Sequence, residues 1–433
     1  MVTWLGSFSA ACLAPDKAAL RSTPPALAHG GRLIVHPPKH SEDSMRGMIM
    51  LLALLSAFPP LSIDMILPAL PSLATAWGQP VATINLILIG FIVTYAFFLL
   101  LYGPLSDRYG RRRPLMVGLG IFVISSLLSA MANNVMLVVL LRALQGAGAA
   151  AGPSLALAMS KDLFSGKDRE RVLAYLGIIV PLAPMLAPTI GGWIMALLSW
   201  HWIFHAQAFM GVIALIGVSR CPETLTNRTS HSLAQVAGAY MRLARNRTYV
   251  ALTLLMAMVT LPFFGFIAGS SHIYITGFGL SEQSFGLFFA FNALCSMAGS
   301  FAFLRLVKGY ESKTLITASF VGILLGGLGM LLGQGFGPWG FALSMAVIAF
   351  SGGMSRPPSN NLILEQVKQE AGAASSLLMF TFFMVGAVAM WLVSLEWESK
   401  QAVIGLLGTG CGGLCLTAWL TMRRMGLVRH ESD

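Results

Sequence analysis

The sequence predicts an all-α polytopic membrane protein, with twelve transmembrane helices arranged in two six-helix halves. Of its 433 residues, 56% are hydrophobic and only 10% are charged, whereas a soluble domain carries roughly a quarter charged residues. The mean hydropathy is +0.74. Apolar runs of about 20 residues, the length that crosses a bilayer as a helix, recur along nearly the whole chain. A large soluble core does not explain runs of this length and number.

The twelve expected spans have limits at 47–69, 83–103, 114–132, 135–157, 172–197, 202–220, 248–269, 283–304, 314–333, 338–355, 372–395 and 401–422. The longest and most polar link follows the sixth span and divides the chain into two groups of six. We therefore expect a cytoplasmic tail at 1–45, a first six-helix bundle at 46–220, a central cytoplasmic loop at 221–247, a second six-helix bundle at 248–424 and a cytoplasmic tail at 425–433.

The first 45 residues hold prolines, histidines and charges without a helical period, a composition typical of a disordered tail. They lack the basic start of a signal peptide. The alternative is that translation begins at Met45 or Met48, because either would open the first span cleanly.

The positions of the basic residues predict the orientation of the spans. Nearly all Lys and Arg residues lie in the tails or in the links after even-numbered spans, and Arg356 is assigned to one of these links. Odd-numbered links carry only Lys400, and only Arg142 lies inside a span. The positive-inside rule then places both termini in the cytoplasm, in a multi-pass protein of the inner membrane. Topology accounts for the net charge of +11, so no nucleic-acid partner is expected.

Neither the cysteines nor the histidines indicate a metal centre. The five cysteines are scattered, without a CxxC or a zinc-type Cys/His spacing. His201 and His205 are four residues apart, which also suits a metal, but Trp200 and Trp202 beside them favour an aromatic belt at the membrane surface. The chain has no Walker A, HExxH or Gx[SC]xG motif. We therefore expect no enzyme activity, cofactor or metal, and no ATP-driven step.

The link between spans 2 and 3 reads "GPLSDRYGRRRPL", residues 103–115. Gly103 lets a neighbouring backbone come near, and Asp107 can face the positive N-terminus of a nearby helix. Arginines would hold the link on the cytoplasmic side. Topology alone is the simpler explanation for these charges, but the spacing Gly-x-x-x-Asp-Arg-x-Gly-Arg-Arg is much more specific than topology requires.

This link resembles the signature loop of the major facilitator superfamily, and the resemblance extends over residues 46–424. It implies a loop that latches the two halves together in one state of a transport cycle. The residues to which the resemblance gives this role are Gly103, Asp107, Arg108, Gly110, Arg111 and Arg112. The corresponding stretch of the second half, "RLVKGYESKTL" (305–315), lacks the Asp-Arg pair, so the expected latch is asymmetric.

Span 4 carries "LRALQGAGAAAGPS", residues 141–154. An arginine inside a bilayer costs at least a few kcal/mol unless it is paired or faces water. The stretch resembles the superfamily's proton-coupling motif, Arg-x-x-Gln-Gly-x-Gly, which Arg142, Gln145, Gly146 and Gly148 match. The alternative is an arginine that only pairs structurally with a neighbour.

Span 5 carries "PLAPMLAPTIGGWI", residues 181–194. It resembles the Gly-Pro-x-x-Gly-Gly motif of the superfamily's antiporters, with Ala187 in place of the first glycine. The residues assigned to this motif are Pro184, Pro188, Gly191 and Gly192. A kinked lipid-facing helix would explain the prolines but not the paired glycines.

Asp64 stands alone in "LSIDMILPALP", residues 61–71, as the only charged residue between Arg46 and Asp107. At 1.5 Å per residue it lies about 25 Å along span 1, and Arg142 lies about 10 Å along span 4. Both then lie in the outer half of the membrane, and the resemblance implies that spans 1 and 4 line a common cavity. We expect a proton-coupling pair in which the arginine favours the ionised carboxylate. The alternative is that Asp64 only caps a helix near the interface.

The stretch "DMILPALP", with "GLSEQSFGLFFAFNA" (279–293), resembles the Bcr/CflA-type drug-resistance transporters. This implies a proton-coupled antiporter that exports hydrophobic or amphipathic drugs, with protons, a small-molecule substrate and the lipid bilayer as its partners, and a monomeric state. "YAFFLLLYG" in span 2 is wholly apolar where that subgroup often carries a polar residue, so the substrate stays open. The alternatives are a metabolite exporter or symporter on the same scaffold and a non-transporting sensor or enzyme, which would need an output domain or a catalytic cluster.

Overall fold

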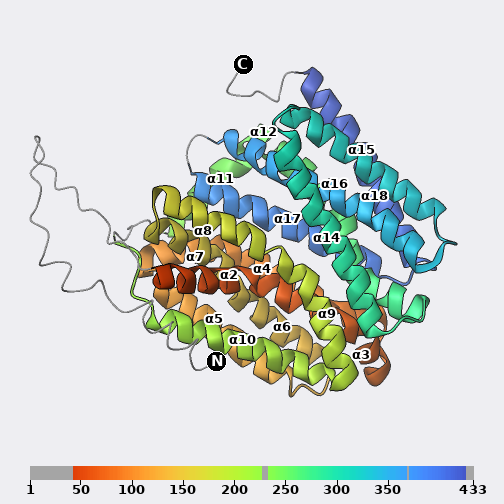
Figure 1. Ribbon diagram of the computed structural model, residues 1–433, viewed down its shortest axis with the longest axis horizontal. Helices are drawn as coiled ribbons and strands as arrows, with labels where there is room; N and C mark the ends of the chain where they lie inside the picture. Colours follow the sequence, from red (N-terminus) through yellow and green to blue (C-terminus); the bar gives the residue numbers. More distant parts are fainter. Residues whose placement is uncertain (1–41, 227–232, 368–369, 426–433) are drawn as a thin grey trace, which may run out of the picture.

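The structure, a computed structural model, describes residues 42–226, 233–367 and 370–425 (Figure 1). Within these ranges the chain is helical and holds no strand. Twelve helical segments are long and apolar enough to cross a membrane, which confirms the predicted fold class. Most of the two expected tails, residues 1–41 and 426–433, lies outside the described residues.

The helices of the first half are α2 (Glu42–Asp64), η2 (Leu67–Ala69), α3 (Leu70–Trp77), α4 (Val81–Tyr109), α5 (Arg112–Ser129), α6 (Val135–Ala149), α7 (Ala151–Leu163), α8 (Gly166–Ile179), α9 (Leu182–Leu197) and α10 (Trp200–Arg220). Those that follow are α11 (Leu233–Arg245), α12 (Arg247–Met258), α13 (Leu261–Ser271), η3 (His272–Gly277), α14 (Glu282–Leu306), α15 (Ser312–Leu332), α16 (Gly337–Glu365), α17 (Ala371–Ser394) and α18 (Lys400–Arg424). Spans 1, 4, 5 and 7 are each built from consecutive helical segments. The central link, expected as a polar loop, contains α11.

Span 1 continues to Trp77, beyond the expected end at residue 69. Pro68 and Pro71 each occupy one of the first two positions of η2 and α3. A proline is tolerated there because its missing N–H would have no partner inside the helix. These prolines therefore start new helical turns. The break in the regular helix begins directly after Asp64, the last residue of α2.

Span 10 also runs further than expected, and its assigned end near residue 355 is wrong. Pro357 and Pro358 lie inside α16, where a proline removes one backbone hydrogen bond. Neighbouring helices can satisfy a carbonyl freed in this way. Here the Ser300 hydroxyl of α14 donates to the Gly353 carbonyl at 3.0 Å, in place of the N–H that Pro357 lacks. Arg356 is thus inside the helix, about 13 Å from its last residue at 1.5 Å per residue, and not in a link.

The two halves meet along α4 with α17 and along α9 with α14 (Figure 1). We call the end of the bundle that carries the 103–113 loop the motif end, and the opposite end the far end. Close contacts join the halves at the far end. A Cβ on Gly192 would lie 2.5 Å from the carbonyl oxygen of Glu282, and a Cβ on Gly286 would lie 2.8 Å from the Cα of Thr189. Glycines therefore allow the backbones of α9 and α14 to touch.

A buried hydrogen bond reinforces this contact on the α4 side. The amide of Asn85, near the far end of α4, donates to the Ala268 carbonyl at 3.1 Å and to the Ser394 hydroxyl at 2.8 Å. Both acceptors belong to the second half, on α13 and α17. The far end is therefore closed by backbone contact on one side and by a polar bridge on the other.

The contact between α15 and α18 gives a test of the packing. A Cβ on Gly327 would lie 2.6 Å from the carbonyl carbon of Gly408, whereas Gly410 on the same helix pair faces open space. We expect Gly327→Ala to destabilise the protein by about 1–3 kcal/mol, the usual cost of overpacking, and to lower the melting temperature in detergent. Gly410→Ala is the matched control and should leave the melting temperature unchanged. Equal melting temperatures for the two variants would contradict the packing.

Candidate functional site

The loop that joins α4 to α5 is held in a conformation that requires glycine. Gly110 has φ +92°, in the region that side chains rarely adopt. A Cβ at Gly110 would also collide with the carboxylate of Glu223. Gly110 is therefore needed both for the turn and for the approach of a residue from the central link.

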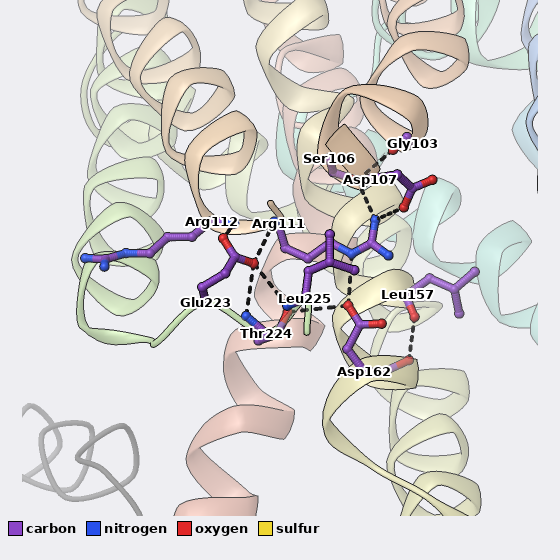
Figure 2. A network of polar contacts seen from close by, with 11 residues as sticks. Gly103, Ser106, Asp107, Arg111, Arg112, Leu157, Asp162, Glu223, Thr224 and Leu225 are labelled. Carbon is purple, nitrogen blue, oxygen red and sulfur yellow. Dashed lines mark hydrogen bonds and ion pairs between the residues drawn. The ribbon is translucent and has the colours of Figure 1, made fainter. Parts of the chain in front are cut away.

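Arg111 is the centre of the polar contacts in this loop (Figure 2). Its Nε donates to Asp162 at the end of α7, at 2.9 Å. Its Nη1 donates to Asp107 at 2.5 Å and to the Ser106 hydroxyl at 2.7 Å. Ser106 in turn donates to the Gly103 carbonyl at 2.7 Å. Arg111 is only 9% exposed, and it ties three parts of the first half together.

Glu223, which sequence reasoning missed, anchors the start of α5 (Figure 2). Its carboxylate accepts from the backbone N–H of Arg111 at 2.8 Å and of Arg112 at 3.3 Å, and from those of Thr224 and Leu225 at 3.0 and 3.1 Å. Negative charge is favourable at a helix N-terminus. Partial burial raises the pKa of Glu223, but these four N–H groups outweigh it and hold the pKa below its usual value. A signal was available, because Glu223 is the only acidic residue between positions 221 and 247.

The other loop residues stay within the first half and the central link. Arg108 is exposed and lies 5.4 Å from the ring centre of Tyr109, and Arg112 donates to the Ser219 carbonyl. In the part of the chain that the structure describes, no hydrogen bond or ion pair of Arg108, Arg111 or Arg112 reaches the second half. The sequence-predicted loop residues are thus brought together, but on one half.

Arg142 is fully buried and belongs to a second polar cluster. Its Nη1 donates to Gln145 Oε1 at 2.5 Å, and its Nε donates to the Ile87 carbonyl at 3.4 Å. The guanidinium also lies 4.4 Å from the ring centre of Phe91, a distance suited to a cation–π contact. Its Nη2 has no hydrogen-bond partner among the described residues.

Gln145 continues this cluster into three other helices. Its amide donates to the Ser126 hydroxyl of α5 at 2.6 Å and to Gln207 Oε1 of α10 at 2.8 Å. Gln207 in turn donates to the Ser62 carbonyl of α2 at 3.2 Å. A buried chain of hydrogen bonds therefore runs from Arg142 to the backbone two residues before Asp64. Gln207 was not predicted from the sequence.

Glycines on α6 make this series of hydrogen bonds geometrically possible. A Cβ on Gly146 would collide with the Phe91 carbonyl, and a Cβ on Gly148 would lie 2.8 Å from the Phe122 nitrogen. These two glycines let α6 approach α4 and α5 closely enough for the short amide side chains to meet.

Asp64 is 4% exposed, and it is the only acidic residue among the buried side chains of the described chain. It is not joined to Arg142 by an ion pair, and no hydrogen bond to its carboxylate is formed by the residues that the structure describes. The expected pair is therefore connected through Gln145, Gln207 and the α2 backbone instead of by direct contact.

The span 5 motif lies between Asp64 and the second half. A Cβ on Gly191 would collide with the carbonyl of Met65, the residue after Asp64, while Gly192 contacts Glu282 across the halves. Pro188 is buried inside α9, and Pro184 lines a cavity. One helix turn thus contacts both the candidate proton site and the far-end closure.

The cavity has a volume of about 320 Å³ and lies between the halves. Pro60, Pro181 and Pro184 line it from the first half, and Phe263, Phe266, Phe289, Asn292, Met345 and Arg356 line it from the second. It extends along α14 to Leu304, which is close to the motif end of that helix. Arg356 was missed as a cavity residue because the sequence assignment put it in a link.

The fold and these sites together define a two-half helical membrane protein with a central cavity and a buried polar chain. The sequence model of the Major Facilitator Superfamily matches residues 52–390. The chain belongs to this superfamily, and it is a multi-pass plasma membrane transporter and not an enzyme.

Curated relatives cover nearly the whole chain. It is 29% identical to the uncharacterized MFS-type transporter YdgK of Bacillus subtilis over 91% of its own length and 99% of the relative's. It is also 29% identical to the bicyclomycin resistance protein homolog of Haemophilus influenzae, over 83% and 92% of the two chains. Multidrug resistance protein D of Escherichia coli is 25% identical, over 87% and 95%. The chain is therefore a relative of bicyclomycin- and multidrug-resistance transporters, as its sequence predicted.

Solved structures agree on the fold. The xylose transporter XylE of E. coli superposes with a TM-score of 0.70 at 14% identity, covering 90% of this chain and 99% of that one. The nucleoside transporter NupG gives 0.68 at 13% identity, covering 87% and 99%. At this identity the likeness concerns the fold alone.

The contacts of Glu223 lead to a prediction for the loop. We expect Glu223→Gln to loosen residues 110–112, with backbone hydrogen exchange about fivefold faster, as for the loss of roughly 1 kcal/mol of helix capping. Because the pKa of Glu223 is lowered, its carboxylate should be ionised at neutral pH, and its hydrogen bonds to the start of α5 should be fully formed. They should be lost as the pH falls below the usual range of a glutamate.

The measurement is hydrogen–deuterium exchange of the purified protein between pH 4 and 8, read on peptides that contain residues 110–112. Glu170→Gln, which changes an exposed glutamate of α8, is the control and should exchange like the unaltered protein. Identical loop exchange in all three proteins would contradict the anchoring role.

Proposed function

We propose that the protein is a proton-coupled antiporter that exports hydrophobic or amphipathic small molecules and acts as a monomer. Relatives named for bicyclomycin and multidrug resistance support the export of such molecules. The apolar, aromatic and methionine-containing wall of the cavity is suited to them. The basic residues at the motif end support a cytoplasmic position for that end and for both termini.

The main support for proton coupling is the chain of hydrogen bonds from Arg142 to the helix of Asp64. Burying an unpaired carboxylate is costly, and a bound proton removes this cost. An intramembrane acid of this kind usually marks an ion pathway. Asp64 is proposed as the proton carrier, and Arg142, Gln145 and Gln207 as the residues that link its occupancy to the packing of α2 against α6 and α10.

Alternating access gives the proposed cycle. In this arrangement the far end is closed by Gly192, Gly286 and Asn85, while the cavity lies toward the motif end. Pro60 on the cavity wall is one helix turn before Asp64, and residues four apart share a helix face. Rocking of the halves would open the far end beside Asp64, while the loop at 103–112 would gain its contact with the second half.

Replacement of the carboxyl group tests the coupling. Everted membrane vesicles with an acidified lumen and a pH-sensitive dye should release protons when bicyclomycin or chloramphenicol is added. Asp64→Asn should abolish this release, because the amide cannot carry the proton. Gln207→Leu should reduce it at least tenfold, because the hydrogen-bond chain is cut and its partners are left unpaired.

Asp168→Asn changes an exposed acid of α8 in the same way and should leave proton release intact. Proton-coupled efflux that survives Asp64→Asn would rule out the role given to this residue. Proton release with no member of a drug panel, combined with no drug resistance in a pump-deleted strain, would favour a metabolite exporter.

A further inference from the structure

Arg356 introduces a charge into the wall of the central cavity. It lies within α16 and is exposed, although other helices surround it. It borders the cavity of about 320 Å³ and also a smaller one lined by Met256, Phe263 and Phe382. Its exposed surface therefore faces the space between the halves.

The positive charge of Arg356 has no acidic counterpart there. Its guanidinium lies 5.4 Å from the ring centre of Phe263, and within the described chain it takes part in no ion pair. No other residue that lines either cavity is charged. The field inside a space with low-dielectric walls therefore favours an anion, and the planar guanidinium suits a carboxylate.

Asn292 of α14 supplies a second, independent observation. It is 3% exposed and lines the same cavity. Its Nδ2 donates to the Phe288 carbonyl at 3.0 Å, but its Oδ1 has no hydrogen-bond partner among the described residues. A buried acceptor without a donor is uncommon, and a donor on a bound molecule would complete it.

Aromatic rings form part of the remaining wall of this site. Phe266 and Phe289 are stacked with ring centres 5.2 Å apart, and both line the cavity with Phe263. The volume is at the lower end of the range for small-molecule pockets. It suits a molecule of about two fused rings that bears one acidic group.

We propose that the cavity is a binding site for amphipathic aromatic anions, with the acidic group held by Arg356 and a donor of the ligand held by Asn292. The inference rests on the proposed function, because it defines the charge class of the exported molecule. Lipophilic cations are disfavoured, because they would meet Arg356 without any carboxylate to pair with them.

Three ligands that share a naphthalene ring and a hydroxyl donor but differ in the charge of the polar group test this inference: 6-hydroxy-2-naphthoate, 6-hydroxy-2-naphthamide and 6-hydroxy-2-naphthylmethylammonium. Binding of tritiated 6-hydroxy-2-naphthoate to the full-length protein in nanodiscs is measured by equilibrium dialysis at pH 7.5, and the other two ligands are used as competitors. We expect naphthoate to bind at least tenfold more tightly than either, as for one charge-assisted hydrogen bond.

Four variants assign the preference to the two residues. Arg356→Gln should reduce the preference to less than threefold, and Arg356→Lys should retain most of it. Asn292→Asp places a carboxylate in the same wall and should shift the preference toward the ammonium ligand. Arg171→Gln removes an exposed arginine of α8 and should change nothing, and melting temperatures show whether each variant is folded.

Equal binding of the three ligands, or an anion preference that survives Arg356→Gln, would overturn the inference. The assay needs no gradient and no transport, so its outcome is independent of proton coupling. Anion-selective binding without proton release by any drug of the panel, aromatic carboxylates included, would disprove only the proposed function. Drug-induced proton release together with equal binding of the three ligands would disprove only the anion site.

Discussion

Hydrogen bonds inside a bilayer have to be completed by the protein itself, because hydrocarbon offers neither donors nor acceptors. The Ser300 hydroxyl occupies the Gly353 carbonyl where Pro357 has no N–H, and α16 therefore continues past two prolines. Arg356, directly before these prolines, lies within the continuous helix and lines the cavity. In the first half, the same requirement is met by amides that join four helices around Arg142. Several buried polar atoms of the described chain still lack a partner, among them the Tyr274 and Thr253 hydroxyls. The unpaired groups of Asp64, Asn292 and Arg356 lie at candidate sites for protons or substrate.

Span 5 provides the mechanical connection between these sites. Gly191 packs on the backbone directly after Asp64, and Gly192 packs on α14 of the other half. Interiors packed this tightly change between discrete arrangements more readily than they deform. A displacement of α14 away from α9 would therefore release one side of the helix that packs on the turn after Asp64, so that opening of the far end and the environment of the carboxyl group would change together.

The number and order of the spans could be predicted from the sequence because an apolar run of membrane length is a local property. The i, i+3 contact between Arg142 and Gln145 was also within reach of sequence reasoning. The partners of Gln207 and Glu223 were not, because they lie 62 to 145 positions away in the chain, although Glu223 itself stands out as the only acidic residue of the central link. The effect of the prolines could not be predicted either. Pro68 and Pro71 start helical segments, and the carbonyl that Pro357 leaves free is satisfied by a neighbouring helix, a contact that the local sequence does not contain.

The separation of the two charges has an energetic consequence for transport. The carboxyl group of Asp64 lies in the first half and the guanidinium of Arg356 in the second, so a proton and an anion would occupy different helices. Exchange of one outgoing anion for one incoming proton moves two positive charges inward. Each charge that crosses the membrane is worth roughly 2.3 kcal/mol per 100 mV, so the membrane potential would contribute about 5 kcal/mol per 100 mV to such a cycle. Export of a monovalent cation for one proton would gain nothing from the potential. An uncompensated arginine in the cavity therefore favours the class of substrate whose export the membrane potential drives most strongly.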